Sequence, residues 1–212
     1  IAQELYEGVE ISGMGAVGLI TYMRTDSLRI SEDAIKSITS YIKERWGKEY
    51  LPKKPRHFKS KANAQDGHEA IRPTMPNLSP EKVIGSLSND QYKLYNLIWE
   101  RFAACQMAEC LQNTTRVDIL ANNYIFKASG YTVKFNGFTV LYQESKDEEE
   151  EKAKELPNLE NGMILKEKEM QKNQHFTEPP PKFTEASLIK FLEEHGIGRP
   201  STYAATISTI LS

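Results

Sequence analysis

The sequence predicts an α+β protein of several domains, with a mainly helical part, a β-rich segment and a final pair of helices. Apolar residues recur at helical spacing through the first half of the chain. From about Asn113 they alternate with polar residues, which is typical of strands. The proline-rich stretch 178–181 then separates this segment from two further helical stretches.

Serine residues that can cap helix N-termini mark the helices of the first half. They are Ser31, Ser79 and Ser88. The apolar spacing that follows them predicts a helix to about Trp46, a short one from Pro80, and one of roughly 20 residues after Ser88.

Other segments are expected to be extended or to turn. We expect an extended segment at 17–24 and a single helical turn at 68–71. Two strands should be joined by a turn at 122–123, and Asn136-Gly137 predicts a second hairpin. Further β-structure is expected around 162–170.

The end of the chain predicts a helix–turn–helix unit. Thr184 can cap a helix over 185–195, and Gly196 and Gly198 provide a turn. Pro200 then suits the first position of another helix.

Composition excludes several classes of protein. No apolar run approaches the ~20 residues of a membrane span. The net charge of −2 gives no basic footprint, so DNA binding must depend on local clusters. Cys105 and Cys110 fit neither a C-x-x-C zinc pattern nor a disulfide scaffold. Because the chain begins without Met and stops inside an expected helix, we expect it to be a piece of a longer protein.

Tyr22 and Arg24 are the first chemical candidates, within "GLITYMRTDS". A phenol with a pKa of about 10 becomes a useful nucleophile when cationic groups favour its anion. Arg24 can form two hydrogen bonds to phosphate oxygens. In an extended segment the two side chains would point to the same side, facing one phosphate. The alternative is an ordinary surface pair beside a turn.

Two further groups can contact phosphates. In "HEAIRPT", His68 and Arg72 would share one face of a helical turn. In "GIGRPSTYA", a glycine turn brings Arg199 to a helix start where Ser201, Thr202 and free backbone N–H groups can surround an anion. Taken singly, each group also fits a purely structural role.

Together these motifs resemble the type IA DNA topoisomerases, in particular their bacterial topoisomerase I branch. The matching blocks follow in order and approximate spacing along almost the whole chain. They are "GLITYMRTDS", "HEAIRPT", "KLYNLIWERFAACQM" and "QHFTEPPPKFTEASLIKFLEEHGIGRPSTYA". Met23 and Arg72 favour this branch over the topoisomerase III branch, and reverse gyrase is a less favoured sister group.

The resemblance implies the role of each candidate residue. Tyr22 matches the nucleophile that becomes linked to a 5′-phosphate, Arg24 the arginine that positions the scissile phosphate, and His68 a histidine of the same pocket. DNA contacts are implied for Thr21, Arg72, Arg199, Ser201 and Thr202. The implied reaction is relaxation of negatively supercoiled DNA by single-strand cleavage, strand passage and religation.

The resemblance also implies an organisation and partners. Residues 1–110 match the domain that carries the tyrosine, 111–180 the β-rich arch, and 181–212 the start of the single-strand-binding domain. We expect Mg²⁺ in the full-length enzyme, held by a Toprim domain outside this chain, and no metal on this chain itself. Neither ATP nor a membrane is expected to take part, and the location should be the bacterial cytoplasm, at the nucleoid.

Without the Toprim domain, this chain is expected not to cleave DNA. The chain has neither a G-x-x-x-x-G-K-[ST] loop, which would bind ATP, nor a D-x-D cluster, which would hold Mg²⁺.

Two alternative classes of protein remain, namely a non-catalytic helix–turn–helix module and a tyrosine recombinase or type IB enzyme. In the latter the tyrosine follows the Arg and His residues, whereas Tyr22 precedes His68.

Overall fold

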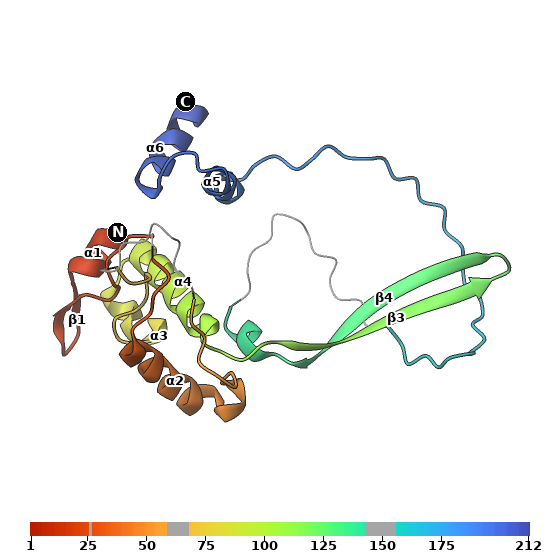
Figure 1. Ribbon diagram of the computed structural model, residues 1–212, viewed down its shortest axis with the longest axis horizontal. Coiled ribbons are helices and arrows are strands. Elements are labelled where there is room, and N and C mark those ends of the chain that lie inside the picture. The colour runs from red at the N-terminus through yellow and green to blue at the C-terminus, as the bar shows by residue number, and fades with distance from the viewer. Residues whose placement is uncertain (26, 59–67, 143–155) are drawn as a thin grey trace. The chain divides into compact units, whose positions relative to one another are not determined.

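The structure is a computed structural model that describes residues 1–25, 27–58, 68–142 and 156–212 (Figure 1). It contains both helices and strands, as the sequence predicts. The chain divides into two compact units, Ile1–Asn113 with Thr132–Glu144, and Thr114–Tyr131 with Ser145–Ser212. The division does not test the three domain ranges implied by the resemblance, which stay a prediction.

The main helices of the first unit begin at the predicted caps. The side chain of Ser31 accepts a hydrogen bond from the Ala34 N–H, and α2 (Glu32–Trp46) follows it and ends at Gly47. Ser88 and Gln91 form a reciprocal capping box at the start of α4 (Asn89–Cys105). These side chains satisfy backbone N–H groups that have no partner within a helix.

Shorter helical turns connect the two long helices. The 3₁₀ turn η1 (Lys48–Tyr50) follows α2. Pro80 opens α3 (Pro80–Val83) as predicted, and the 3₁₀ turn η2 (Ile84–Ser86) continues it. The Ser79 side chain makes no capping hydrogen bond in α3, so here the proline alone marks the helix start.

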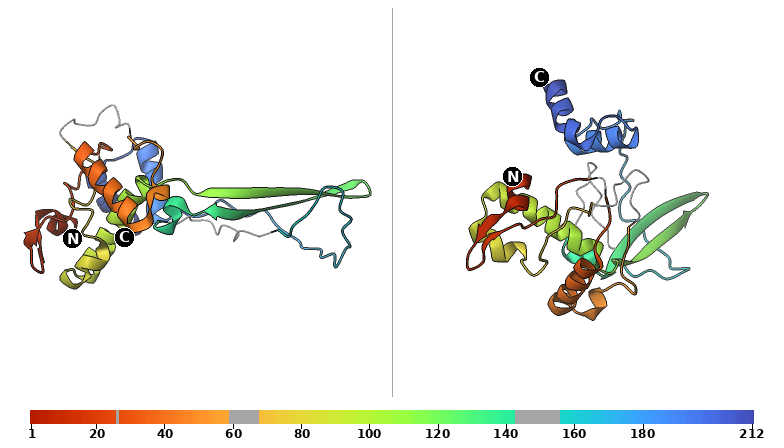
Figure 2. Two further views of the ribbon diagram at one scale, coloured as in Figure 1. Left: turned by 90° about the horizontal axis from the view of Figure 1, so that it is seen from below. Right: turned by 60° about the vertical axis from the view of Figure 1, so that its left-hand side comes forward.

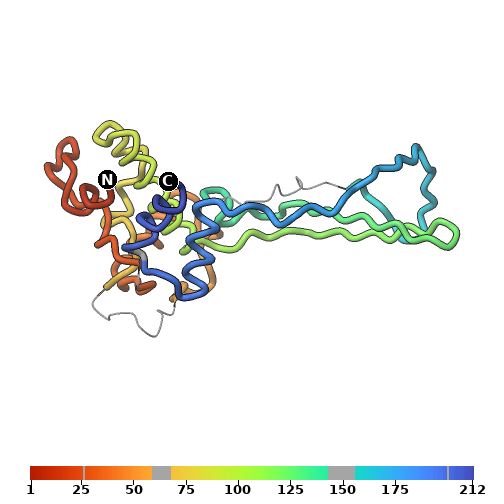
Figure 3. The backbone as a smooth tube through the Cα atoms, turned by 90° about the horizontal axis from the view of Figure 1, so that it is seen from above, coloured from red at the N-terminus to blue at the C-terminus, as the bar shows by residue number. Residues whose placement is uncertain are grey.

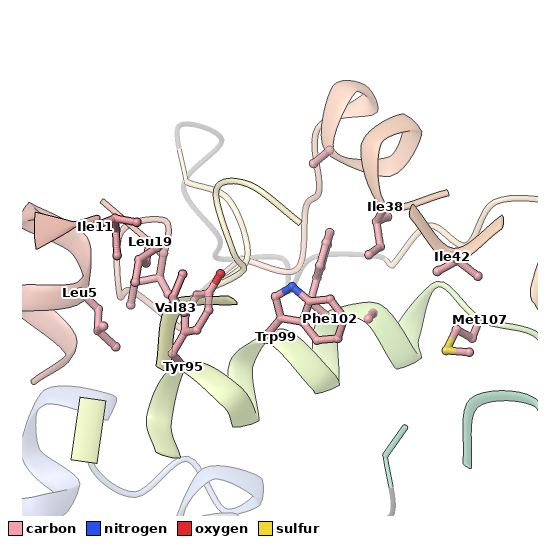
Figure 4. Close-up of a cluster of buried hydrophobic side chains, with 13 residues drawn as sticks. Leu5, Ile11, Leu19, Ile38, Ile42, Val83, Tyr95, Trp99, Phe102 and Met107 are labelled. Atoms are coloured by element: carbon pink, nitrogen blue, oxygen red, sulfur yellow. The ribbon is translucent and has the colours of Figure 1, made fainter. Parts of the chain in front are cut away.

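The hydrophobic core of the first unit lies between α2 and α4 and extends to the N-terminal segment (Figure 4). Its fully buried members include Ile38 and Ile42 of α2, Tyr95 of α4, and Leu5 and Leu19 near the N-terminus. The apolar faces of both long helices thus contribute to one core, as their spacing predicts.

The N-terminal segment folds in a way that the sequence analysis did not anticipate. Helix α1 (Ala2–Glu7) is followed by strands β1 (Val9–Ile11) and β2 (Gly15–Val17), which pair antiparallel with Val9 opposite Val17. Each element is too short to give a periodic signal in the sequence. This segment carries Leu5 and Leu19 into the core, immediately before the predicted tyrosine site.

A long β-hairpin follows α4. Strands β3 (Leu111–Ala121) and β4 (Tyr124–Phe135) pair with one another and run side by side in the views of Figures 1 and 2. The turn between them falls at Asn122-Asn123, as predicted, and Asn122 adopts a positive φ of 53°. Asparagine tolerates this left-handed conformation better than most residues.

The second hairpin, predicted at Asn136-Gly137, is wrong. The chain there enters a 3₁₀ turn, η3 (Gly137–Val140), and the Phe138 N–H donates to the Ala108 carbonyl at 2.9 Å. An added Cβ on Gly137 would lie 2.3 Å from the Glu109 carbonyl oxygen. This glycine therefore serves a close approach of two backbone segments rather than a strand turn.

The second unit ends in the predicted pair of helices. Thr184 and Ser187 form a capping box at α5 (Glu185–Glu194), and α6 (Pro200–Leu211) follows the glycine turn. The β-structure predicted around 162–170 is wrong, because this stretch forms no strand in the structure (Figure 1). Figure 3 traces the course of its backbone before α5. Its side chains lie exposed, and Ile164 is 95% exposed, so no neighbouring strand pairs with it among the described residues.

Candidate active site around Tyr22

Tyr22 lies in the irregular segment between β2 and α2, with half of its surface exposed. The Arg24 N–H donates to the Tyr22 carbonyl at 2.9 Å, which closes a three-residue turn. The expectation of an extended segment to residue 24 is therefore wrong at this end. The alternation that would point Tyr22 and Arg24 to one side does not apply across such a turn.

The two motifs that carry Tyr22 and His68 are neighbours in the structure. Ile20 and Pro73 form an isolated antiparallel bridge. The Thr21 N–H donates to the Arg72 carbonyl at 2.9 Å, and the Thr74 N–H donates to the Leu19 carbonyl at 3.0 Å. Residues more than fifty positions apart in the chain are thus joined by backbone hydrogen bonds directly before Tyr22.

The ring of Tyr22 has two other rings as neighbours. The centroid of the His68 ring is 6.0 Å away and that of the Tyr6 ring is 5.3 Å away. The pairing of Tyr22 with His68 brings together two residues that the sequence analysis selected. Tyr6 was missed, because the short helix α1 gives no recognisable signal and a lone tyrosine carries none.

A glycine allows Tyr6 to approach. The Leu19 N–H donates to the Leu5 carbonyl at 2.7 Å, so the chain leading to Tyr22 lies against the C-terminal end of α1. An added Cβ on Gly18 would lie 2.5 Å from the Tyr6 carbonyl oxygen. Only glycine fits this contact without a shift of the backbone.

The segment after His68 is not helical, so the expectation of a helical turn at 68–71 is wrong. Its backbone bonds go to other segments: the Ala70 N–H donates to the Arg29 carbonyl at 2.8 Å, and the Ala70 carbonyl accepts from Thr21 Oγ1 at 2.7 Å. The Arg29 side chain also donates through Nε to the His68 carbonyl, at 3.4 Å. His68 and Arg72 consequently do not share a helix face.

The Arg72 guanidinium is engaged within the chain. Nη2 and Nε lie 2.6 and 3.1 Å from Glu69 Oε2, and the two side chains are only 11% and 20% exposed. Nη1 donates to the Pro73 carbonyl at 3.0 Å, and Nη2 to Ser31 Oγ at 3.4 Å. Whether Arg72 also contacts DNA stays a prediction.

The predicted DNA-binding residues of the second unit gather at the start of α6. Arg199, Ser201 and Thr202 are all exposed there. Thr202 Oγ1 accepts from the Arg199 N–H and donates to the Arg199 carbonyl, both at 2.9 Å. Arg199 Nη1 donates to the Gly198 carbonyl at 3.3 Å. A DNA contact by these residues stays a prediction.

Residues 1–25, 27–58, 68–142 and 156–212 bring no three His, Cys, Asp or Glu side chains together as a metal site. The expectation that Mg²⁺ is held outside this chain stays a prediction. None of the helices in these ranges is long and apolar enough to cross a membrane.

Comparison with known proteins agrees with these motifs. A family model described as DNA topoisomerase matches residues 1–212. The chain is 51% identical to DNA topoisomerase 1 of Rickettsia felis over 99% of the chain and 27% of that protein, and equally similar to that of Rickettsia bellii. A structure of full-length topoisomerase I from Thermotoga maritima matches with a TM-score of 0.74 and 35% identity, over 99% of this chain and 33% of that one.

The chain spans about a quarter of the length of the Rickettsia relatives. The match nevertheless covers every block that carries the predicted residues, from Tyr22 to Thr202. The chain therefore belongs to the bacterial topoisomerase I family of type IA DNA topoisomerases.

Proposed function

We propose that this chain supplies the nucleophile of a type IA DNA topoisomerase that relaxes negatively supercoiled DNA. In this proposal one strand is cut, another is passed through the break, and the cut strand is rejoined. Tyr22 carries the chemistry, with Arg24 and His68 beside it. The observation that supports the proposal most directly is the half-exposed Tyr22 ring beside the His68 ring, where both motifs meet.

The reaction is a transesterification at phosphorus. Tyr22 Oη loses its proton and attacks a phosphodiester, so that the Tyr22 O–P bond forms while the P–O3′ bond breaks and the 3′ oxygen leaves as a hydroxyl. The DNA keeps its 5′-phosphate on Tyr22. The number of phosphoester bonds does not change, and rejoining therefore requires no ATP.

Charge around the phosphate is the main requirement of such a step. Arg24 can stabilise the phosphate oxygens through two parallel hydrogen bonds. His68 is suited to donate a hydrogen bond or a proton near the reacting oxygens, because a histidine ring carries N–H donors and is a common general acid. Both roles require side chains close to Tyr22, and His68 meets this requirement.

We propose Mg²⁺ and a Toprim domain of the same protein as the missing parts. Mg²⁺ would be held outside this chain and would supply further positive charge. The proposed place of action is the bacterial chromosome, in the cytoplasm.

The start of α6 is proposed to hold the single strand that leads to the cleavage site. Free N–H groups at a helix N-terminus attract phosphates, and Ser201 and Thr202 add hydroxyl groups there. Arg199 adds a permanent charge next to them. These residues are proposed to position the strand without reading its sequence.

The test uses the full-length protein with Tyr22→Phe, which removes only the attacking oxygen. We expect loss of the covalent protein–DNA adduct and of plasmid relaxation, with binding of a single-stranded oligonucleotide retained. Tyr124→Phe is the matched control, because this tyrosine is 74% exposed at the hairpin turn and should leave activity unchanged.

The same assay separates the alternatives. An adduct on the 5′-phosphate leaves a 3′-hydroxyl that a polymerase can extend, whereas a tyrosine recombinase or type IB enzyme leaves a 3′-phosphotyrosine. A non-catalytic helix–turn–helix module would show no adduct in the wild-type protein. Persistence of the adduct in Tyr22→Phe would assign the nucleophile to another residue.

A further inference from the structure

We propose that Thr21 is a positioning residue for Tyr22, acting through an internal brace with Arg72, and is not a DNA contact. This inference rests on the proposed function, in which Tyr22 is the nucleophile. It concerns two residues for which the sequence analysis implied DNA contacts. The brace is the set of hydrogen bonds that joins Thr21, Arg72, Glu69 and Ser31.

The hydroxyl group of Thr21 is committed within the chain. Oγ1 donates its one proton to the Ala70 carbonyl at 2.7 Å and accepts from the Arg72 N–H at 3.0 Å. The Thr21 N–H donates to the Arg72 carbonyl at 2.9 Å. A threonine hydroxyl has a single donor, so Thr21 has no side-chain proton left to donate to a phosphate oxygen.

Arg72 connects Thr21 to helix α2. Its guanidinium lies on Glu69 and also donates to Ser31 Oγ at 3.4 Å. Ser31 Oγ in turn accepts from the Ala34 N–H at the first turn of α2, at 3.3 Å. The guanidinium is largely buried, and its hydrogen bonds to Glu69, Pro73 and Ser31 restrict the conformations that it can adopt.

The brace joins the two sides of the candidate site. Thr21 directly precedes the nucleophile, and Ala70, which it binds, lies two residues after His68. Ala70 is also held from its other side by the Arg29 carbonyl, at 2.8 Å. The brace thereby fixes the placement of the Tyr22 ring against the His68 ring, whose centroids are 6.0 Å apart.

The exact position of the Tyr22 ring should affect the rate of cleavage more than the affinity for DNA. A small displacement of a reacting group lowers the rate of the chemical step, while removal of a hydrogen bond to DNA weakens binding. The two roles of Thr21 therefore predict different kinetic behaviour. A positioning role lowers the rate of adduct formation and leaves the DNA Kd unchanged, whereas a DNA-binding role raises the Kd.

The experiment compares Thr21→Val and Thr21→Ser in the full-length protein. Valine has the shape of threonine but neither donor nor acceptor, and serine retains both. With an end-labelled single-stranded oligonucleotide, we expect Thr21→Val to form the Tyr22 adduct about 10- to 100-fold more slowly. Thr21→Ser should stay close to wild type. The Kd, measured in a Tyr22→Phe background that cannot cleave, should not change with either substitution.

Glu69→Gln provides a second arm that does not alter Thr21. It removes the charge that pairs with Arg72, and the hydrogen bonds of the described residues connect Glu69 to Thr21 through Arg72. We expect slower adduct formation with an unchanged Kd here too, and a thermal melt of each variant checks that it is folded.

Adduct formation at the wild-type rate in Thr21→Val, or a loss of rate matched by a rise in Kd, would overturn the brace. If Thr21→Val does not fold, a wild-type rate in Glu69→Gln overturns it instead. Failure of the proposed function is a separate result, since it would appear as adduct formation by Tyr22→Phe itself.

Discussion

Single buried polar groups connect the candidate site to the core of the first unit. Tyr95 on α4 is fully buried, and its hydroxyl donates to the Leu78 carbonyl at 2.7 Å. One helical turn further, the indole N–H of Trp99 donates to the Pro76 carbonyl at 3.0 Å. Both carbonyls belong to the stretch that follows the His68 motif. Helix α4 thus holds the far end of the segment that pairs with Thr21.

Tyr95→Phe tests the contribution of the hydrogen bond between the Tyr95 hydroxyl and the Leu78 carbonyl. The change leaves the partly buried Leu78 carbonyl without this donor, and loss of such a hydrogen bond costs about 0.5–1.5 kcal/mol of unfolding free energy. Denaturant unfolding at neutral pH measures the loss. The matched control is Tyr92→Phe on the same helix, which is only partly buried and should change stability by less than about 0.5 kcal/mol. Equal stability of both variants would contradict the prediction.

Tyr95 also predicts how stability depends on pH. Burial raises the pKa of Tyr95 well above its usual range, whereas the unfolded chain titrates near a pKa of about 10. Above that pH the unfolded state loses a proton that the folded state keeps, so stability is constant below it and falls as pH rises. Unfolding at pH ~9 and pH ~11 should show a smaller fall in Tyr95→Phe than in the wild type. Parallel pH profiles would contradict this assignment.

Helices could be predicted where the residues that start them lie close together in the sequence. The side-chain caps at Ser31, Ser88 and Thr184 are confirmed, because a cap depends on residues three positions apart. The helical turn at 68–71 was wrong for the opposite reason. Its backbone groups bond to Thr21 and Arg29, about forty to fifty residues away, and such partners leave no trace in a short stretch of sequence.

The same limit applies to the β-rich segment and to the site. The pattern around 162–170 favours a strand, but a strand forms only with a partner, and the described residues supply none. At the site, Tyr22 and His68 could be selected from their motifs. Neither Tyr6 nor the internal contacts of Thr21 could be predicted, since they depend on how α1 and the 68–74 segment approach.

Gly137→Ala tests the close contact that replaced the predicted hairpin. Alanine would have to adopt a φ of 52° with its Cβ 2.3 Å from the Glu109 carbonyl oxygen. The left-handed conformation alone costs roughly 1–2 kcal/mol, and the backbone overlap adds to it. Gly85→Ala is the control, because nothing lies within 4 Å of its added Cβ. Gly137→Ala should melt at a clearly lower temperature than Gly85→Ala. Equal melting temperatures would contradict the close contact between Gly137 and Glu109.

At the scale of the whole molecule, the chain carries the proposed nucleophile but spans about a quarter of its Rickettsia relatives. In the proposed function, Tyr22 supplies the attacking oxygen, Arg24 one permanent charge and His68 one hydrogen-bond donor. Phosphoryl transfer depends on charge placed around several oxygens of the phosphate at once. We therefore propose that this chain forms only part of the catalytic surroundings, and that the Toprim domain supplies the remainder.

This proposal predicts that the isolated chain does not cleave DNA. Incubated with negatively supercoiled plasmid and Mg²⁺, it should give neither nicked circles nor a covalent adduct after denaturation with detergent, because the phosphate oxygens lack the charges held elsewhere. The full-length enzyme under the same conditions should give both, and its Tyr22→Phe variant neither. Binding of a single-stranded oligonucleotide by the isolated chain serves as the check that it is folded. A covalent adduct formed by the isolated chain, and lost in its Tyr22→Phe variant, would show that the residues described here suffice for cleavage.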